Sequence, residues 1–287
     1  MRWLVVGSYG MLGQDLIARL SAEGEVVTAV DRDTLDITDP EAVLAAVPGH
    51  DVVANCAAFT AVDPAEEQEG AAFAVNAVGA ANLARAAGRT GARMLHISTD
   101  YVFDGVASSP YAEDAPPAPR SAYGRTKAAG EWAVRAMAPR HLIVRTAWLY
   151  GAHGNSFPKT IARVARAGGP LAVVTDQVGQ PTWTVDLADL VVRLVLDGAP
   201  SGTYHGTSSG ETSWYEFARA VVTAAGLDAA IVGETTSTAF VRPAPRPAYS
   251  VLGHDALTAI GVAPIGPWRE RWDAAAPLVI GEAQPAV

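Results

Sequence analysis

This chain of 287 residues has almost no cysteine and very little lysine. Its single cysteine, Cys56, excludes an internal disulfide and is typical of a protein kept in a reducing cytoplasm. Only two lysines occur, Lys127 and Lys159, so the position of each is informative.

Long apolar runs and an excess of positive charge are also missing. No run of about 18 apolar residues occurs, and the N-terminus enters a strand-like segment at once, so we expect neither a membrane span nor a signal peptide. With 21 Lys and Arg against 30 Asp and Glu, the formal net charge is −9, which argues against binding to nucleic acid or acidic membranes. These absences predict a soluble, cytoplasmic globular protein.

What the first half does contain is a regular alternation of short apolar runs with longer helical patterns. The runs are nearly continuous hydrophobic stretches, as expected for parallel strands covered on both faces, and they lie at Trp3–Val6, Val26–Val30, Val52–Ala54, Met94–Ile97 and Leu142–Val144. Helical patterns lie between them, at Met11–Leu20, Glu41–Val47, Ala71–Ala87 and Ser121–Met137. This alternation predicts an α/β fold with a doubly wound parallel Rossmann sheet in residues 1–150.

Beyond residue 150 the elements become shorter. We expect residues 151–287 to form mainly a smaller C-terminal lobe that would bind a substrate. Segments near 171–198 would return to the sheet, with Val185–Leu196 as the best helix candidate. Ser213-Trp-Tyr-Glu216 is a capping box that predicts a helix running to about Ala225. The last residues, Glu282–Val287, are expected to be frayed.

A glycine triplet, Gly7-Ser-Tyr-Gly10-Met-Leu-Gly13, directly follows the first predicted strand and opens the first helix. The glycines allow a tight turn, close approach of a pyrophosphate and close helix–strand packing, and the helix N-terminus favours negative charge. The spacing differs from the commoner Gly-x-Gly-x-x-Gly. Its place between strand and helix nevertheless favours a dinucleotide site over a plain turn, with Gly7, Tyr9, Gly10, Met11, Leu12 and Gly13 around the cofactor.

The end of the second strand bears on which nicotinamide cofactor is used. Asp31 stands where an acid usually holds the adenosine ribose, which favours NADH. Its neighbour Arg32 could meet a 2′-phosphate instead, so NADPH stays open. Asp36 and Ile37 either flank the adenine or form a surface turn.

Tyr123 and Lys127 are spaced one helical turn apart in a predicted helix, and therefore share a face of it. An ammonium about 5 Å from a phenol, at an effective dielectric near 20, stabilises the phenolate by roughly 3 kcal/mol, or about two pKa units. That would bring the phenol into a useful range for proton transfer. Thr99 ends the fourth strand, at the edge of a parallel sheet where ligands bind.

Eight stretches spread nearly end to end carry a family resemblance, namely Gly7–Gly13, Ala57–Asp63, Ser98–Gly105, Tyr123–Lys127, Arg145–Trp148, Asp176–Thr182, Gly202–His205 and Arg246–Ser250. The stretch Ser98-Thr-Asp-Tyr-Val-Phe-Asp-Gly105 is the most diagnostic. The chain resembles the extended short-chain dehydrogenases/reductases, and within them the dTDP-4-dehydrorhamnose reductases. The resemblance implies NAD(P)H-dependent reduction of the C4 ketone of a dTDP-4-keto-6-deoxyhexose, most simply dTDP-4-dehydro-L-rhamnose to dTDP-L-rhamnose.

The resemblance also implies roles for individual residues. Tyr123 would protonate the carbonyl oxygen, Lys127 would lower the pKa of that phenol and bind the nicotinamide ribose, and Thr99 would hydrogen-bond the carbonyl. Further cofactor contacts would come from Ala57, Ala58, Thr60 and Asn76. The substrate pocket would be lined by Val62, Asp100, Tyr101, Val102 and Trp148.

The diphosphate of such a substrate needs positive charge in an acidic protein. Arg246 is the best candidate, because prolines on either side hold it and a pre-set guanidinium can bind phosphate oxygens in a bidentate manner. Its neighbour Arg242 is interpreted as a surface charge.

Other functions fit the sequence less well. Related dehydratases carry Asp-Glu after the Thr, whereas this chain has Asp100-Tyr101, so the second carboxylate is missing. An epimerase is harder to reject. A 4-ketoreductase of another dTDP-deoxysugar, in an antibiotic or streptose-type pathway, and a non-catalytic NAD(P)-binding regulatory subunit are the alternatives.

Two properties stay open at this stage. Some members of the family hold Mg²⁺ through acidic side chains at a subunit contact, and Asp15 lies where one such acid would be wanted. The C-terminal acidic pattern does not match, so the sequence does not favour a required metal. Pairing into a homodimer is neither indicated nor excluded.

Overall fold

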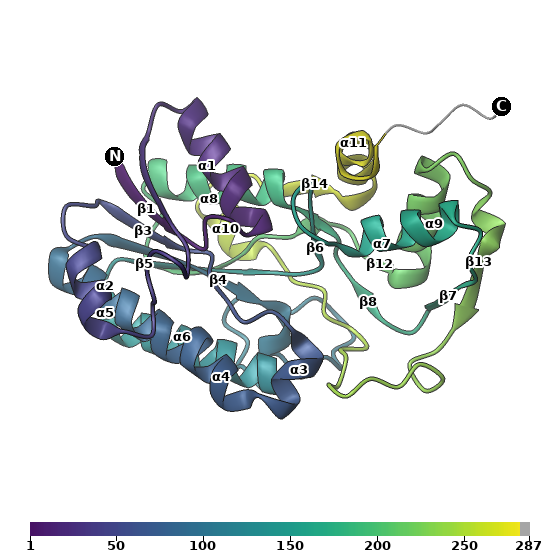
Figure 1. The fold of residues 1–287 in the computed structure, drawn as a ribbon, viewed down its shortest axis with the longest axis horizontal. Helices are drawn as coiled ribbons and strands as arrows, with labels where there is room; N and C mark the ends of the chain where they lie inside the picture. Colours follow the sequence, from purple (N-terminus) through teal and green to yellow (C-terminus); the bar gives the residue numbers. More distant parts are fainter. Residues whose placement is uncertain (282–287) are drawn as a thin grey trace.

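A six-stranded parallel sheet forms the centre of the molecule in the computed structural model, which describes residues 1–281 (Figure 1). The strand order is β10-β5-β4-β3-β1-β2, so the chain winds outward in both directions from its first strand. The predicted Rossmann fold is confirmed. The strands are β1 (Arg2–Val6), β2 (Val26–Val30), β3 (Val52–Asn55), β4 (Arg93–Thr99), β5 (His141–Thr146) and β10 (Gly202–His205).

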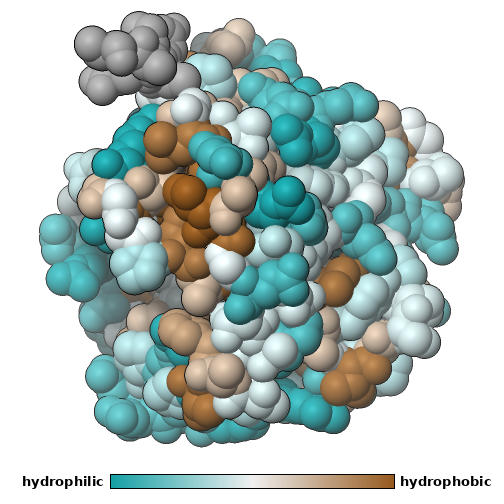
Figure 2. Space-filling model, turned by 90° about the vertical axis from the view of Figure 1, so that its right-hand side faces the viewer, coloured by the Kyte–Doolittle hydropathy of each residue, from teal (hydrophilic) through white to brown (hydrophobic). Residues whose placement is uncertain are grey.

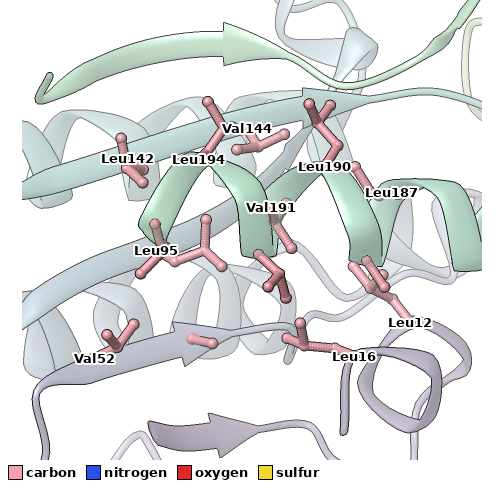
Figure 3. Packing of buried hydrophobic residues seen from close by; sticks show 14 of the residues in the cluster. Leu12, Leu16, Val52, Leu95, Leu142, Val144, Leu187, Leu190, Val191 and Leu194 are labelled. Atoms are coloured by element: carbon pink, nitrogen blue, oxygen red, sulfur yellow. The ribbon is translucent and has the colours of Figure 1, made fainter. Parts of the chain in front are cut away.

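Successive side chains of a strand point to opposite faces of the sheet, and in these strands both sets are apolar. Helices therefore cover both faces. Trp3 and Val5 pack under α1 (Met11–Ala22) and α8 (Thr184–Leu196), in the cluster drawn in Figure 3. Residues Leu4 and Val6 point the other way. On that face lie α2 (Pro40–Ala46), α5 (Ala80–Thr90) and α6 (Ala122–Met137).

The predicted helix 71–87 is not a single regular helix. It is divided into α4 (Glu69–Phe73), a π-helical turn η1 (Ala74–Gly79) and α5. The extra residue per turn in η1 accompanies an internal hydrogen-bond network around Asn76, described below. Such π-turns occur frequently at functional sites.

The return of the chain to the sheet also differs in detail from the prediction. The expected helix at Val185–Leu196 is α8, which packs on α1 and against the sheet, but β7 (Leu171–Val174) lies in the smaller lobe, where it pairs with β13 (Val232–Thr235). The sheet gains its sixth strand, β10, from residues after 198 instead.

The smaller lobe is built around an aromatic core. Phe217 and Trp272 meet at 5.4 Å between ring centroids, and Tyr150 packs against both. The predicted cap of the helix after Ser213 is confirmed, since the Ser213 hydroxyl accepts from the Glu216 N–H at 3.1 Å. The helices of this lobe are α7 (Phe157–Arg166), α9 (Trp214–Ala224) and α11 (Trp268–Ile280), whereas α10 (Asp255–Ala259) returns to pack against β10 of the central sheet.

Several short elements complete the described chain. They are α3 (Val62–Glu67), η2 (Asp100–Val102), β6 (Leu149–Tyr150), β8 (Val178–Gly179), β9 (Thr182–Trp183), β11 (Ser208–Ser209), β12 (Thr212–Ser213), η3 (Ala229–Ile231) and β14 (Ile265–Pro267). The segment expected to fray, 282–287, lies outside the described residues.

The end of the molecule formed by the smaller lobe has a mixed surface. Figure 2 shows hydrophobic side chains gathered toward one side of this face and hydrophilic ones over most of the rest. Within residues 1–281, none of the helices combines the length and the apolar character needed to cross a bilayer.

Candidate active site

The loop between β1 and α1 has the geometry of a phosphate-binding turn. Gly7 has a φ of +80°, and a Cβ on Gly13 would lie 2.2 Å from the Gly7 carbonyl oxygen, so both positions require glycine. Helix α1 begins without a side-chain cap and without an acidic residue in its first turn. Its first N–H groups can therefore serve an anionic ligand. Of the residues predicted here, Leu12 is buried in the core, so only its backbone can take part.

Asp31 is held by backbone amides at the end of β2. Its carboxylate accepts from the N–H of Tyr9 at 2.9 Å and from that of Arg32 at 2.8 Å. The Arg32 side chain is 92% exposed, and its nearest charged partner is Asp33 at 3.8 Å. An exposed cation beside an acid held by backbone amides suits either a ribose hydroxyl, bound by the acid, or a 2′-phosphate, bound by the cation.

The predicted adenine contacts at Asp36 and Ile37 are placed differently by the structure. The Ile37 side chain is buried in the core against Gly79, so it does not point toward a cofactor. The Asp36 carboxylate accepts from both the N–H and the hydroxyl of Thr38. These contacts favour the surface-turn alternative.

The loop after β3 is held from behind by Asn76. The Asn76 carboxamide accepts from the Phe59 N–H at 2.8 Å and donates to the Phe59 carbonyl and to the Thr126 hydroxyl. All of these groups lie within the protein, and Asn76 is 1% exposed. The structure thus corrects the predicted direct contact: Asn76 positions the loop. Ala57, Ala58 and Thr60 remain at its accessible surface.

Thr99, Tyr101 and Tyr123 come together where β4 ends and α6 begins. The rings of Tyr101 and Tyr123 are edge-to-face at 5.6 Å between centroids. Helix α6 can approach this closely because residue 124 is glycine: a Cβ there would lie 2.2 Å from the Tyr101 carbonyl oxygen. The Ser121 hydroxyl caps the helix by accepting from the Gly124 N–H at 3.0 Å.

The protonation of Tyr123 differs from the expectation. Burial raises its pKa above the ordinary value, only partly opposed by the Thr99 hydroxyl, while the charge of Asp100 raises it further. Lys127 is not among the groups that shift it. Tyr123 is therefore a neutral phenol at physiological pH, which is the form that a proton donor must have.

Lys127 stands one turn after Tyr123 in α6 and is 2% exposed. Its ammonium donates to the Ile97 carbonyl oxygen at 2.6 Å. Burial lowers its pKa to about 8, against the charge of Glu131, which lies one turn further along α6. Glu131 itself is held by bonds from Ser98 and Arg145 at 2.6 and 2.9 Å. Lys127 is thus one end of a buried row of polar groups that continues to Glu131, Ser98 and Arg145.

Asp100 lies behind the site rather than in it. It is 2% exposed and accepts from the Thr99 hydroxyl at 2.9 Å. Burial raises the pKa of Asp100 to about 6. A direct contact with substrate, as predicted, would need this carboxylate to become accessible, so its evident part is to orient Thr99.

The remaining predicted substrate residues separate into two groups. Val102 is fully buried in a small core cluster with Phe103 and Leu252, which contradicts its predicted place in the pocket. Val62 and Trp148 are partly exposed. Trp148 has a φ of +47°, unusual for a bulky residue, and its ring stacks on Trp214 at 3.6 Å between centroids. Strain of this kind is often kept for function.

Arg246 is already engaged by a carboxylate that the sequence reading did not single out. Its Nη2 donates to Asp63 Oδ1 at 2.9 Å. Arg242, interpreted above as a surface charge, donates from Nε to the other oxygen of Asp63 at 2.8 Å. The only hint in the sequence was that Asp63 closes one of the family-like motifs.

Asp15, considered above as a magnesium ligand, is mostly buried in α1. The His153 imidazole lies beside it, with 3.6 Å between Nε2 and Asp15 Oδ1. In the described part of the chain, no group of three or more His, Cys, Asp or Glu side chains could hold a metal ion.

Comparisons with known proteins agree along the whole chain. The family model described as "RmlD substrate binding domain" matches residues 1–277. A Streptomyces antibioticus protein named "Probable dTDP-4,6-dihydroxy-2-methyloxan-3-one 4-ketoreductase" is 48% identical, over 99% of this chain and 98% of its own. The dTDP-4-dehydrorhamnose reductase of Streptomyces griseus is 48% identical, over 98% and 95%. A crystal structure of dTDP-4-dehydrorhamnose reductase from Bacillus anthracis in complex with NADP superposes with a TM-score of 0.92 at 36% identity, over 96% and 98%.

Proposed function

This chain belongs to the family described as the RmlD substrate binding domain, and on that premise we propose that it reduces the C4 ketone of a dTDP-4-keto-6-deoxyhexose with a nicotinamide cofactor. The family expected from the motifs is confirmed, and the chain is an NAD(P)H-dependent oxidoreductase. The most direct substrate is dTDP-4-dehydro-L-rhamnose, giving dTDP-L-rhamnose. The relative named as a 4-ketoreductase of another dTDP-sugar keeps a second deoxysugar pathway as the alternative.

The observation that carries the proposal is the grouping of a neutral phenol, a hydroxyl and a buried amine at the carboxyl end of β4. Ketone reduction needs a hydride, a proton and a group that stabilises the developing alkoxide. The nicotinamide supplies the hydride when bound. Tyr123 would donate its proton to O4 of the sugar, and the Thr99 hydroxyl would donate a hydrogen bond to the same oxygen after turning away from Asp100, to which it donates in this structure.

Lys127 would bind the nicotinamide ribose. Its ammonium lies in the buried row that continues to Glu131, where Ser98 and Arg145 hold the carboxylate in place. Because Lys127 does not shift the pKa of Tyr123, we assign its positive charge to the cofactor and not to the phenol.

The backbone end of the site would hold the rest of the cofactor. The N–H groups at the start of α1 suit its pyrophosphate. We propose that NADPH is accepted, with Arg32 meeting the 2′-phosphate, because the Asp31 carboxylate accepts from two backbone amides while the Arg32 side chain is exposed to solvent. The relative solved with NADP supports this choice.

The substrate end would be formed by Tyr101, Trp148, Val62 and Arg246. Tyr101 is packed against the proton donor, so it would contact the sugar. Arg246 would bind the diphosphate. In the proposed division of the chain, residues 1–150 form the cofactor-binding domain, with Val62, Tyr101 and Trp148 facing the substrate, and residues 151–287 mainly form the substrate-binding lobe.

A non-catalytic regulatory subunit is the alternative from another class. A binding module has no need for Thr99, Tyr123 and Lys127 together, so their grouping favours the enzyme. The test is to follow NADPH and NADH oxidation after adding dTDP-4-keto-6-deoxyglucose, with and without a 3,5-epimerase. Oxidation that depends on the sugar supports the reductase, whereas cofactor binding without turnover of any keto sugar supports the regulatory subunit.

A further inference from the structure

We propose that Asp63 is a positioning residue for substrate binding: it fixes Arg246 and Arg242 so that they present a preformed cationic site to the diphosphate of the nucleotide sugar. The inference rests on the proposed function. It adds a residue on the cofactor-binding half of the chain that organises the cations of the other half.

The contacts of Asp63 use both of its carboxylate oxygens. Oδ2 accepts from Arg242 Nε at 2.8 Å and from its Nη2, and Oδ1 accepts from Arg246 Nη2 at 2.9 Å and from the Ala244 N–H at 3.2 Å. The Asp63 carboxylate therefore bonds to three residues, Arg242, Ala244 and Arg246, within a stretch of five. These bonds restrict the rotation of both arginine side chains before any ligand binds. Less side-chain entropy is then lost on binding than with two unrestrained arginines.

The segment held in this way is a strap from Ser237 to Tyr249. At one end, the Ser237 N–H and hydroxyl donate to the carboxylate of Asp176. At the other end, the N–H groups of Ala248 and Tyr249 donate to the Gly105 carbonyl oxygen at 2.9 and 3.0 Å. The strap is thus anchored at both ends, and Asp63 fixes its middle.

The position of the strap places its cations beside the reaction centre. Arg246 is close enough to the Tyr101 hydroxyl to lower the pKa of that phenol, although burial outweighs this and raises the pKa to about 12. Tyr101 in turn packs on Tyr123. Asp63 is the second residue of α3, directly after the loop expected to contact the cofactor. It therefore ties the cofactor loop to the arginines.

The charge balance suits an anionic ligand. Asp63 and the two arginines carry one surplus positive charge, in a chain of net charge −9. Burial alone would raise the pKa of Asp63, but the Ala244 N–H and the two guanidinium groups outweigh it and lower the pKa, so the acid stays ionised. Side-chain exposure is 15% for Asp63, 19% for Arg246 and 45% for Arg242, so the cluster is sheltered but reachable.

The test measures binding of dTDP, which carries the diphosphate without the sugar, by calorimetry on the full chain. We expect Asp63→Asn to weaken dTDP binding and to raise KM for the keto sugar, both by about tenfold, with kcat and the Kd for NADPH changed less than about twofold. A purely structural defect would lower kcat and cofactor affinity as well. The matched control is Asp186→Asn, since Asp186 also starts a helix and pairs with one arginine, Arg271, through two bonds at 2.8 and 2.7 Å. It should leave dTDP affinity unchanged.

A double-mutant cycle with Arg246→Gln shows whether Asp63 acts through that arginine. Strongly non-additive losses of dTDP affinity support the proposal, whereas additive losses, unchanged binding or tighter binding of dTDP by Asp63→Asn overturn it. If Asp63→Asn does not fold, Arg242→Gln removes one anchor of the strap while leaving Asp63 and Arg246 paired. It should weaken dTDP binding by about threefold, and unchanged binding would again overturn the proposal. Because dTDP binding needs no turnover, the result stands apart from the reductase assay.

Discussion

The cofactor end and the substrate end of this active site differ in the kind of group that would bind the ligand. The cofactor end consists mainly of backbone: a glycine turn, the free N–H groups of α1, and an acid held by two amides. The substrate end consists of side chains held by other side chains, such as Arg246 by Asp63 and Trp148 by Trp214. Backbone geometry is insensitive to most substitutions, whereas a side-chain network can be changed one member at a time. We therefore expect point mutations to alter chemistry and sugar recognition more than cofactor binding.

The strongest test of this difference is Tyr123→Phe, which removes the proton donor without disturbing the glycine turn. We expect kcat to fall by at least about a hundredfold, because the developing alkoxide then has no acid beside it. The Kd for NADPH should change little. Stopped-flow turnover and fluorescence titration of NADPH measure the two quantities, and near-normal turnover would refute the role of Tyr123.

Asp100→Asn examines the buried carboxylate behind Thr99. The pKa of Asp100 is raised in the folded protein to about 6, so the stabilisation that its protonated form provides is present at low pH and is lost as the pH rises through 6. An asparagine side chain does not titrate, so the variant does not lose stability in this way. The free energy of unfolding of the variant minus that of the wild type should therefore be about 2 kcal/mol larger at about pH 7.5 than at about pH 4.5. Urea unfolding at both pH values measures this, and a difference that does not vary with pH would contradict it.

Lys127 is proposed to bind the nicotinamide ribose, and loss of its positive charge should limit activity at high pH. Burial lowers its pKa to about 8, so the ammonium is lost above that pH. Since kcat/KM reports groups of the free enzyme, it should decline above about pH 8, approaching tenfold for each further pH unit. A profile that stays flat to about pH 10 would show that the charge of Lys127 is not needed.

The smallest effect is expected from Arg32→Ala at the cofactor end. Arg32 is an exposed side chain, and exposed charges contribute modestly because solvent screens them. We expect KM for NADPH to rise by about three- to tenfold and KM for NADH to stay unchanged. Equal changes for both cofactors would mean that Arg32 does not meet the 2′-phosphate.

The strands and helices that could be predicted from the sequence are those with a regular pattern of apolar residues. The five apolar runs became β1 to β5 because fully buried parallel strands need continuous hydrophobic residues. Strand β10 escaped notice, since Gly202–His205 is short and has no such run. Nor could the π-turn around Asn76 be read from a helical pattern, because it depends on bonds to Phe59 and Thr126, far away in the chain.

For the site, the sequence indicated residue types and spacing but not which way side chains point. Val102 was assigned to the substrate pocket and Ile37 to the adenine or a surface turn, and both side chains lie in the core. The pKa of Tyr123 was expected to be lowered by Lys127, whereas burial raises it. The pairing of Asp63 with Arg246 spans 183 positions of sequence, so no local pattern could reveal it.

The central claim is that this chain delivers a hydride from a nicotinamide to C4 of a dTDP-keto sugar. It is tested most directly by incubating the protein with dTDP-4-keto-6-deoxyglucose, its 3,5-epimerase and NADPH carrying deuterium at the transferable position, followed by NMR of the product. The account predicts a reduced dTDP-6-deoxyhexose with deuterium at C4. An unreduced sugar, or a reduced sugar with only solvent-derived hydrogen at C4, would contradict it.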